Sequence, residues 1–322
     1  MIKKFESICK MSQKNLKKYV VGVLKETYTD VTVGDGFVFA KGTFPVLLVA
    51  HLDTVHKKLP NVIVYDANQD SMFSPNGIGG DDRCGVYMIL EIIQHYNCSV
   101  LFCEDEEIGG VGAKKFIQTD LANELEFNYA IELDRKGDKD AVFYDCDNEE
   151  FEKFITEDFY RTACGSFSDI SVVAPFLGCA AVNLSCGYYN AHSVEEYVVL
   201  GEMEKSIEEV YKILEKTTET DKFEYIERQY HGFRGVYSYK GSGINTNGWY
   251  GSGWYNSGWA EEEEEEEDEN YYLIEFYDNA TGKTNWYETW AMSEAEAVGR
   301  FLMWYPDLCY HNIIDILVDK TH

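Results

Sequence analysis

The stretch Val46-Leu47-Leu48-Val49-Ala50-His51-Leu52-Asp53 places an apolar run directly before a histidine and an aspartate. The apolar residues predict a buried strand, since a short continuous hydrophobic run is typical of one. His51 and Asp53 are two residues apart, so in an extended chain their side chains lie on the same face. A histidine can bind a metal ion while a nearby carboxylate orients its ring, so the stretch predicts a strand that ends at a metal site.

Similar patterns continue on both sides of this stretch. Apolar runs at Val100–Cys103 and Tyr129–Leu133 predict further strands, and Arg83–His95 and Lys205–Leu214 have apolar residues at helical spacing. The segment 62–73 resembles a hairpin. Strands separated by helices predict an α/β fold in which helices flank a mostly parallel central sheet.

Four more motifs carry acidic residues or a histidine near the ends of the expected strands and helices. They are Gly79-Gly80-Asp81-Asp82-Arg83, Glu104-Asp105-Glu106-Glu107, Asp134 with Glu132 as a competing ligand, and Asn190-Ala191-His192-Ser193. Singly, each has an ordinary structural interpretation: a helix N-cap, a solvated turn or a structural histidine. We expect a helix to begin near Glu195, directly after the last of them.

Together the motifs supply two histidines and several carboxylates in alternating strand and helix context. In open α/β sheets the loops that follow the strands converge on one crevice. Mixed histidine and carboxylate ligands suit zinc, with manganese and cobalt as alternatives. The sequence therefore predicts a metal site at one edge of the sheet.

In this order the motifs resemble those of the co-catalytic zinc metallopeptidases, which include the M20, M28 and M42 families. The resemblance covers about residues 1 to 218. It rests on Val49-Ala50-His51-Leu52-Asp53-Thr54-Val55, Gly79-Gly80-Asp81-Asp82-Arg83-Cys84-Gly85-Val86, Glu106-Glu107-Ile108-Gly109, and His192-Ser193 before Glu196-Tyr197-Val198.

The resemblance implies an enzyme, a metal-dependent hydrolase with two divalent metal ions, most simply zinc. One ion would be bound by His51 and Asp134 and the other by Glu107 and His192, with Asp81 bridging both. The catalytic residues would be Asp53, which orients His51, and Glu106, the general base. The Asp81–Asp82 peptide bond would be cis, as it often is in this group.

The function implied is that of an aminopeptidase-like exopeptidase. It would cleave an amide bond of small peptides by a metal-bridged hydroxide, from which Glu106 takes a proton. Two alternatives remain. One is an N-acyl amino acid deacylase, which acts on an acylated amino acid. The other is a binding or scaffold protein whose catalytic site is vestigial.

The sequence departs from the resemblance in two respects. Arg83 stands where lysine is common after the aspartate pair. The gaps from His51 to Asp81 (81 − 51 = 30) and from Asp134 to His192 (192 − 134 = 58) are too short for the inserted domains of some relatives. We therefore expect a bare catalytic domain, in which the segment 165–169 shapes the substrate pocket.

Beyond this domain, residues 219–270 predict a flexible linker. They contain a Gly-Trp repeat at 247–259 and an acidic run at 261–269. The tryptophans could alternatively form a ligand platform. Residues 271–322 predict a small ββαβ domain whose helix runs from Ser293 to about Tyr305. A module of this size is marginally stable alone, so we expect it to bind a protein partner.

The bulk composition excludes two classes of function. The formal net charge of −29 argues against nucleic-acid binding, because such a field repels phosphates. No apolar run approaches the roughly 18 residues of a membrane-spanning helix, and the N-terminus has no pattern of a secretory signal. The nine cysteines include no C-x-x-C pair. We expect them to be reduced and the protein to be cytoplasmic.

Overall fold

The computed structural model describes residues 1–228, 270–278, 283–291, 297, 301 and 313–319. The chain divides into two compact units, Met1–Arg228 and Gln229–His322. The first unit extends beyond position 218, where we expected the linker to begin. Residues 223–228 still pair with it, through the bridges between Cys179 and Glu224 and between Cys146 and Glu227.

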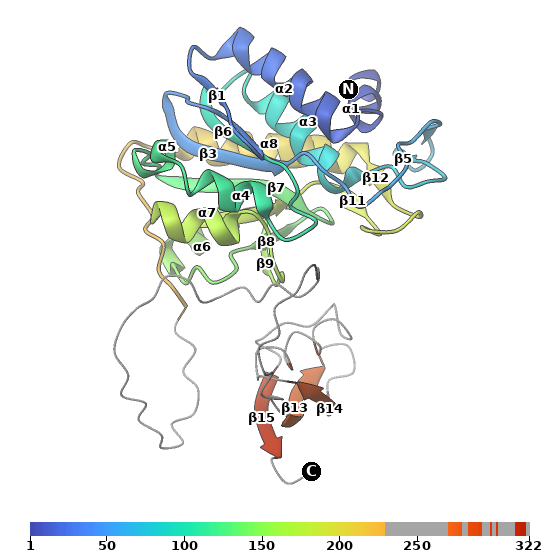
Figure 1. The fold of residues 1–322 in the computed structure, drawn as a ribbon, viewed down its shortest axis with the longest axis vertical. Helices are drawn as coiled ribbons and strands as arrows, with labels where there is room; N and C mark the ends of the chain where they lie inside the picture. The colour runs from blue at the N-terminus through green and yellow to red at the C-terminus, as the bar shows by residue number, and fades with distance from the viewer. Residues whose placement is uncertain (229–269, 279–282, 292–296, 298–300, 302–312, 320–322) are drawn as a thin grey trace, which may run out of the picture. The chain divides into compact units, whose positions relative to one another are not determined.

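An eight-stranded sheet forms the centre of the first unit (Figure 1). In spatial order its strands are β1 (Val31–Val33), β2 (Phe37–Ala40), β6 (Cys98–Cys103), β3 (Phe44–His51), β7 (Tyr129–Arg135), β10 (Ala181–Ser185), β8 (Asp140–Val142) and β9 (Arg161–Ala163). The four central strands β6, β3, β7 and β10 run parallel. The sheet therefore confirms the predicted fold class.

Helices cover both faces of this sheet (Figure 1). One face packs against α1 (Ile2–Cys9), α2 (Gln13–Thr27), α3 (Gly80–Ile92), α6 (Glu149–Thr156) and α8 (Leu200–Lys216). The other packs against α4 (Val111–Phe116), α5 (Asp120–Asn123) and α7 (Ile170–Leu177). Each face of the sheet contributes to its own hydrophobic core.

The strand that opened the sequence analysis shows why the sheet is covered twice. Along β3, Leu48 and Ala50 belong to the core on one face, and Leu47 and Val49 to the core on the other. Successive side chains of a strand point to opposite faces. A continuous apolar run therefore needs a hydrophobic layer on each side.

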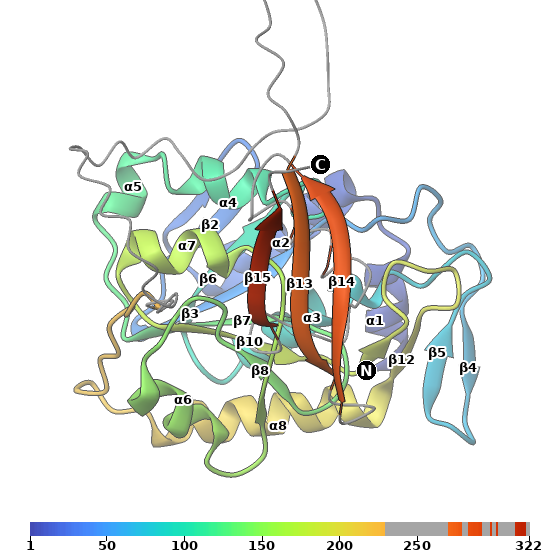
Figure 2. The same ribbon diagram turned by 90° about the horizontal axis from the view of Figure 1, so that it is seen from below.

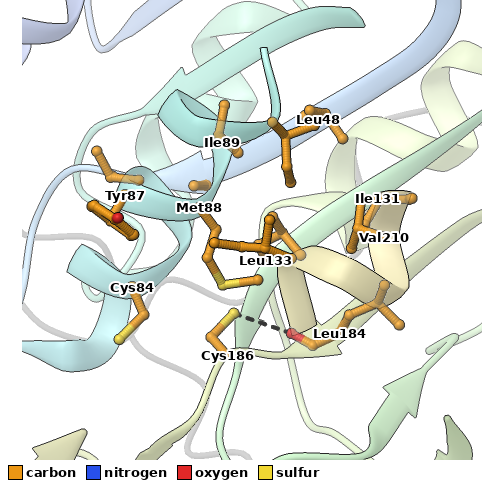
Figure 3. Packing of buried hydrophobic residues seen from close by; sticks show 14 of the residues in the cluster. Leu48, Cys84, Tyr87, Met88, Ile89, Ile131, Leu133, Leu184, Cys186 and Val210 are labelled. Carbon is orange, nitrogen blue, oxygen red and sulfur yellow. Dashed lines mark hydrogen bonds between the residues drawn. The ribbon is translucent and has the colours of Figure 1, made fainter. Parts of the chain in front are cut away.

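Helix α3 is the most deeply buried helix over the sheet, and Figure 3 shows Met88 of α3 beside Leu133 of β7. All of its residues except Glu91 are buried. Gly85 lets it approach so closely, because a Cβ atom there would lie 1.7 Å from the carbonyl oxygen of Leu133. The glycine therefore sets the distance between the helix and the sheet.

We expect Gly85→Ala to lower the free energy of unfolding by about 2 to 3 kcal/mol or more, since an added methyl must push the helix off the sheet. Equilibrium urea unfolding measures this. Gly22→Ala is the matched control, because Gly22 lies in an exposed helical position with open space around it. That change should instead raise stability by about 0.5 kcal/mol. Equal effects of the two changes would contradict this packing.

A second, smaller sheet has the strand order β11 (Tyr188–Tyr189), β12 (Tyr197–Val199), β5 (Ser71–Phe73) and β4 (Val64–Asp66). The pair β4–β5 confirms the expected hairpin, which lies at the periphery of the unit in Figure 2. The prediction that a helix begins near Glu195 was wrong. Residues 197–199 form β12, which pairs with β5, and α8 begins at Leu200.

The described part of the second unit is a three-stranded antiparallel sheet. Its strands are β14 (Lys283–Ala291), β13 (Asn270–Asp278) and β15 (Ile313–Asp319), in that order. They confirm the three strands of the predicted module, and Phe276 packs against Phe301 at a ring distance of 4.8 Å. The expected helix 293–305 lies almost wholly outside the described residues, as do the Gly-Trp repeat and the acidic run.

Seven of the cysteines are free and buried, as expected for small core residues: Cys9, Cys84, Cys98, Cys103, Cys146, Cys179 and Cys186. The expectation of reduced cysteines fails at Cys164, which is disulfide-bonded. Among the described helices, none combines the length and the apolar character that crossing a bilayer requires.

Candidate metal centre

The candidate site lies at the carboxyl ends of three neighbouring parallel strands. β3 ends at His51, β6 precedes the loop that carries Glu106 and Glu107, and β7 carries Asp134 near its end. Parallel strands end at the same edge of a sheet, so their following loops meet there. This places residues up to about 80 positions apart in the sequence within reach of one another.

The first set of ligand atoms comprises His51, Asp81 and Asp134, here called the His51 group. Nε2 of His51 lies 3.0 Å from Oδ1 of Asp81 and 3.5 Å from Oδ1 of Asp134. The His51 side chain is fully buried. The ring therefore presents one nitrogen to two carboxylates while it is itself shielded from water.

The second set, here called the His192 group, comprises Asp81, Glu107 and His192. Nε2 of His192 lies 3.2 Å from Oδ2 of Asp81 and 3.1 Å from Oε2 of Glu107. The two histidines thus approach opposite oxygens of the same carboxylate. Within each group the ligand atoms all lie within 4.8 Å of one another. The structure brings together all five residues expected as ligands.

Glu132, the competing candidate, belongs to neither group among the described residues. Its side chain is fully buried, and its Oε2 accepts a hydrogen bond from the N–H of Ile170 at the start of α7. Glu132 and Asp134 are two residues apart in β7 and so lie on one face, and the difference between them lies in their position along the strand. Asp134 sits at the open end of β7, whereas Glu132 lies deeper, under α7.

Asp53 connects the histidine to the loop that follows β6. Its Oδ1 lies 3.1 Å from Nδ1 of His51 and accepts a hydrogen bond from the N–H of Glu106 at 3.0 Å. Its Oδ2 accepts from the N–H of Glu107 at 3.1 Å. One carboxylate therefore orients the His51 ring and holds the segment that carries Glu106 and Glu107.

Asp82 supports the site through hydrogen bonds to the main chain, a role that the sequence did not indicate. Its Oδ2 accepts a hydrogen bond from the N–H of His51, and its Oδ1 accepts one from the N–H of Gly85. The Asp81–Asp82 peptide bond is cis, as the resemblance implied. The two aspartates thus have different roles. Asp81 contributes ligand atoms, whereas the Asp82 carboxylate binds main-chain N–H groups, among them that of His51 at the end of β3.

Asn183 and Tyr188 hold Asp134, and neither was singled out from the sequence. The Asn183 amide accepts from the N–H of Asp134 at 2.9 Å and donates to its carbonyl oxygen at 3.1 Å. The Tyr188 hydroxyl donates to the same carbonyl at 3.1 Å. The only available signal was a polar Asn inside the apolar run of β10, where a buried amide needs partners.

Arg83, the departure noted in the sequence, points away from the ligand groups. Its buried guanidinium donates to the carbonyl oxygens of Leu52 and, at 3.2 Å, Met11. It therefore braces the loop after His51 against the turn between α1 and α2. Because the Arg83 guanidinium donates to these main-chain carbonyls, we assign it a structural role and not a role in ligand binding.

The site concentrates buried acid. Burial raises the pKa of Glu106 to about 9, with Asp134 and Asp169 adding to the rise against the opposing field of His51. Burial and the nearby Asp81 raise the pKa of Asp134 to about 7. Burial would also raise that of Asp81, but hydrogen bonds with His192 and His51 lower its pKa below the ordinary value. So many carboxylates in one buried place call for positive charge.

Comparison with known proteins places the fold but not the family. No protein-family model matches the sequence, and no curated protein does. Solved structures do match. The aminopeptidase PepT from Bacillus cereus is 15% identical with a TM-score of 0.54, and the match covers 66% of this chain and 97% of that one.

Two further solved structures give the same result. A tripeptidase from Staphylococcus aureus is 12% identical with a TM-score of 0.53, covering 66% of this chain and 96% of that one. A TET aminopeptidase from a marine sediment Thaumarchaeota archaeon is 13% identical with a TM-score of 0.54, covering 68% and 98%. This chain therefore shares the α/β fold of these peptidases.

Proposed function

We propose that the chain is a two-metal hydrolase that cleaves the amide bond at the amino end of small peptides. The observation that carries the proposal is the position of the Asp81 carboxylate between the two histidines. Its Oδ1 lies near His51 and its Oδ2 lies near His192. Beside them stands Glu106, a carboxylate that belongs to neither group. Two ligand sets with a shared carboxylate and a separate acid are what a co-catalytic hydrolase needs.

The residues present fit divalent cations. Each ligand group offers one histidine and two carboxylates, a donor set that suits zinc and also manganese or cobalt. Oε1 of Glu107 is buried and has no hydrogen-bond partner among the described residues. A buried carboxylate oxygen without a partner is costly, and a bound cation would satisfy it. We propose zinc as the native metal.

When bound, the cations would polarise the substrate carbonyl and lower the pKa of an attacking water. The chain itself supplies the proton carrier. Oε2 of Glu106 lies 4.0 Å from Nε2 of His51, beside both groups but outside them. Glu106 would accept the proton of the attacking water and deliver it to the departing amine. Asp53 would keep the His51 ring and the main chain of Glu106 in the same relative position during the reaction.

The net charge of the chain favours a substrate with a cationic end. The formal net charge is −29, and Arg83 is occupied by main-chain carbonyls. An N-acyl amino acid brings a free carboxylate and no positive charge, so this field would repel it. A small peptide with a free amino terminus has a carboxylate too, but it adds a cationic ammonium group that this field attracts. We therefore favour the aminopeptidase over the deacylase.

We expect short peptides with a free amino terminus to be hydrolysed with a kcat/KM about 10- to 100-fold higher than their N-acetylated counterparts, the effect of losing one charge-assisted interaction. Amino acid release from matched di- and tripeptides, before and after chelation, measures this. Elemental analysis of the protein should give two metal ions per chain.

Other results would select the alternatives. Hydrolysis of acylated amino acids in preference to free peptides would establish a deacylase. A protein that binds no metal and hydrolyses neither class would be a binding or scaffold protein, with residues 271–322 as the module for its protein partner.

A further inference from the structure

Glu196 is a buried carboxylate that contacts the main chain of Asp81, the residue shared by both ligand groups. Its side chain is fully buried. Oε1 accepts a hydrogen bond from the N–H of Asp81 at 3.0 Å, and Oε2 accepts one from the N–H of Gly79 at 2.7 Å. Oε2 also lies 2.8 Å from Nε2 of His56. Both oxygens therefore have hydrogen-bond partners, and two of the three partners are the main-chain N–H groups of Gly79 and Asp81.

These contacts join three loops that are far apart in the sequence. Glu196 follows His192 by four residues and directly precedes β12. His56 lies in the loop that follows His51 and Asp53. The carboxylate thus touches the loop after β3, the loop before α3, and its own loop. Each of these loops contains or directly adjoins a segment with a residue of a ligand group: His51 at the end of β3, Asp81 at the start of α3, and His192.

The segment that presents Asp81 is packed closely around this contact. Gly79 has a φ of 73°, and a Cβ on Gly80 would lie 2.8 Å from side-chain atoms of Tyr188 and Val198. A Cβ on Gly77, also at positive φ, would lie 2.1 Å from the His56 ring. The glycines let the main chain close around Glu196, so the carboxylate and the loop are fitted to each other.

The two histidines differ in how they are held. His51 is buried at the end of β3, and Asp134 of its group is fixed by Asn183. The His192 side chain is 59% exposed, and residues 190–195 include no buried residue. Glu196 is the first buried residue after this exposed loop. The distance between His192 and Asp81 therefore depends on Glu196 more than any distance in the His51 group does.

We propose that Glu196 is a positioning residue that fixes Asp81 relative to His192 and so sets the affinity of the His192 group for its metal ion. It acts through the N–H groups of Gly79 and Asp81, and it does not itself join a ligand group. This inference rests on the proposed function, because it takes both groups as metal sites. It adds that the two sites respond unequally to one buried carboxylate.

The test is Glu196→Gln, with Glu195→Gln as the matched control. A glutamine has one acceptor oxygen and would turn an N–H₂ group toward a donor. Glu195 is its exposed neighbour. Calorimetric titration of the metal-free proteins with zinc should show one ion bound as in the unaltered protein and the other bound about 10- to 100-fold more weakly in Glu196→Gln. Glu195→Gln should match the unaltered protein.

A second variant keeps the test decisive if Glu196→Gln does not fold. His56→Ala leaves the carboxylate in place and removes one of its three partners, so it should weaken the same ion by a smaller factor. Circular dichroism of the metal-free proteins separates a positioning role from a loss of fold. Excess zinc should restore full occupancy to a protein that has lost only positioning.

The outcomes separate this inference from the proposed function. If the unaltered protein binds no zinc, the proposed function fails first. If it binds two ions and folded Glu196→Gln binds both within about twofold of the same affinities, Glu196 is not a positioning residue. Unchanged affinities in folded His56→Ala overturn it when Glu196→Gln cannot be measured. Equal weakening of both ions also overturns it, because the proposal assigns the effect to the His192 group.

Discussion

Replacing Glu106 by glutamine is expected to lower kcat for peptide hydrolysis by about 10²- to 10⁴-fold while two metal ions stay bound. Glutamine keeps the size of the side chain but cannot accept and return a proton. Glu106 belongs to neither ligand group, and its main-chain N–H is held by Asp53. The change therefore removes the proton carrier and leaves the ligand atoms where they are.

Asp105→Asn is the matched control for this prediction. Asp105 is in the same loop at a positive φ, which asparagine tolerates, and its carboxylate contacts Gln13 away from the ligand groups. Steady-state kinetics on a dipeptide should give a kcat close to that of the unaltered protein. A Glu106→Gln protein that retains more than about a tenth of the activity would rule out Glu106 as the general base.

The predictable part of the fold was local. The apolar run 46–50 lies inside β3, and the runs that begin at Val100 and Tyr129 lie inside β6 and β7. Each run is long enough to be read without knowing its partner strand. Because the ligand candidates directly follow these runs, their convergence at one edge of the sheet could also be expected from parallel topology.

The missed part depends on distant partners. Residues 197–199 became β12 because they pair with residues 71–73, a contact that no local pattern records. Asn183 belongs to no motif, and Glu196 stood in the last motif without a role of its own. Their roles exist only where the fold brings a main-chain N–H to their oxygens. Side chains that bind metal resemble one another between proteins, whereas the side chains that hold them are specific to each fold.

The shared carboxylate is the most demanding position of the site. Asp81 must face His51 with one oxygen and His192 with the other, while its N–H is held by Glu196. Asp134 and Glu107 each meet only one histidine. A change at Asp81 should therefore affect both groups, whereas a change at Asp134 or Glu107 should affect one.

We expect Asp81→Asn to lower the metal content from two ions per chain to fewer than one and to reduce kcat/KM by at least about 10³-fold, because both groups lose a charged ligand. Asp134→Asn and Glu107→Gln are the matched comparisons, and each should retain one ion. Elemental analysis after extensive dialysis measures the content directly.

Thermal unfolding gives a second readout that does not depend on activity. An ion at about 100 times its Kd stabilises the folded protein by about 2.7 kcal/mol, so chelation should lower the Tm of the unaltered protein. The decrease should be smaller in Asp134→Asn and in Glu107→Gln, and close to zero in Asp81→Asn, which has little bound metal to lose. An Asp81→Asn protein that keeps two ions and a full chelator response would show that Asp81 does not bridge the two groups. The two histidines would then belong to independent sites, and the co-catalytic mechanism would no longer follow from the geometry.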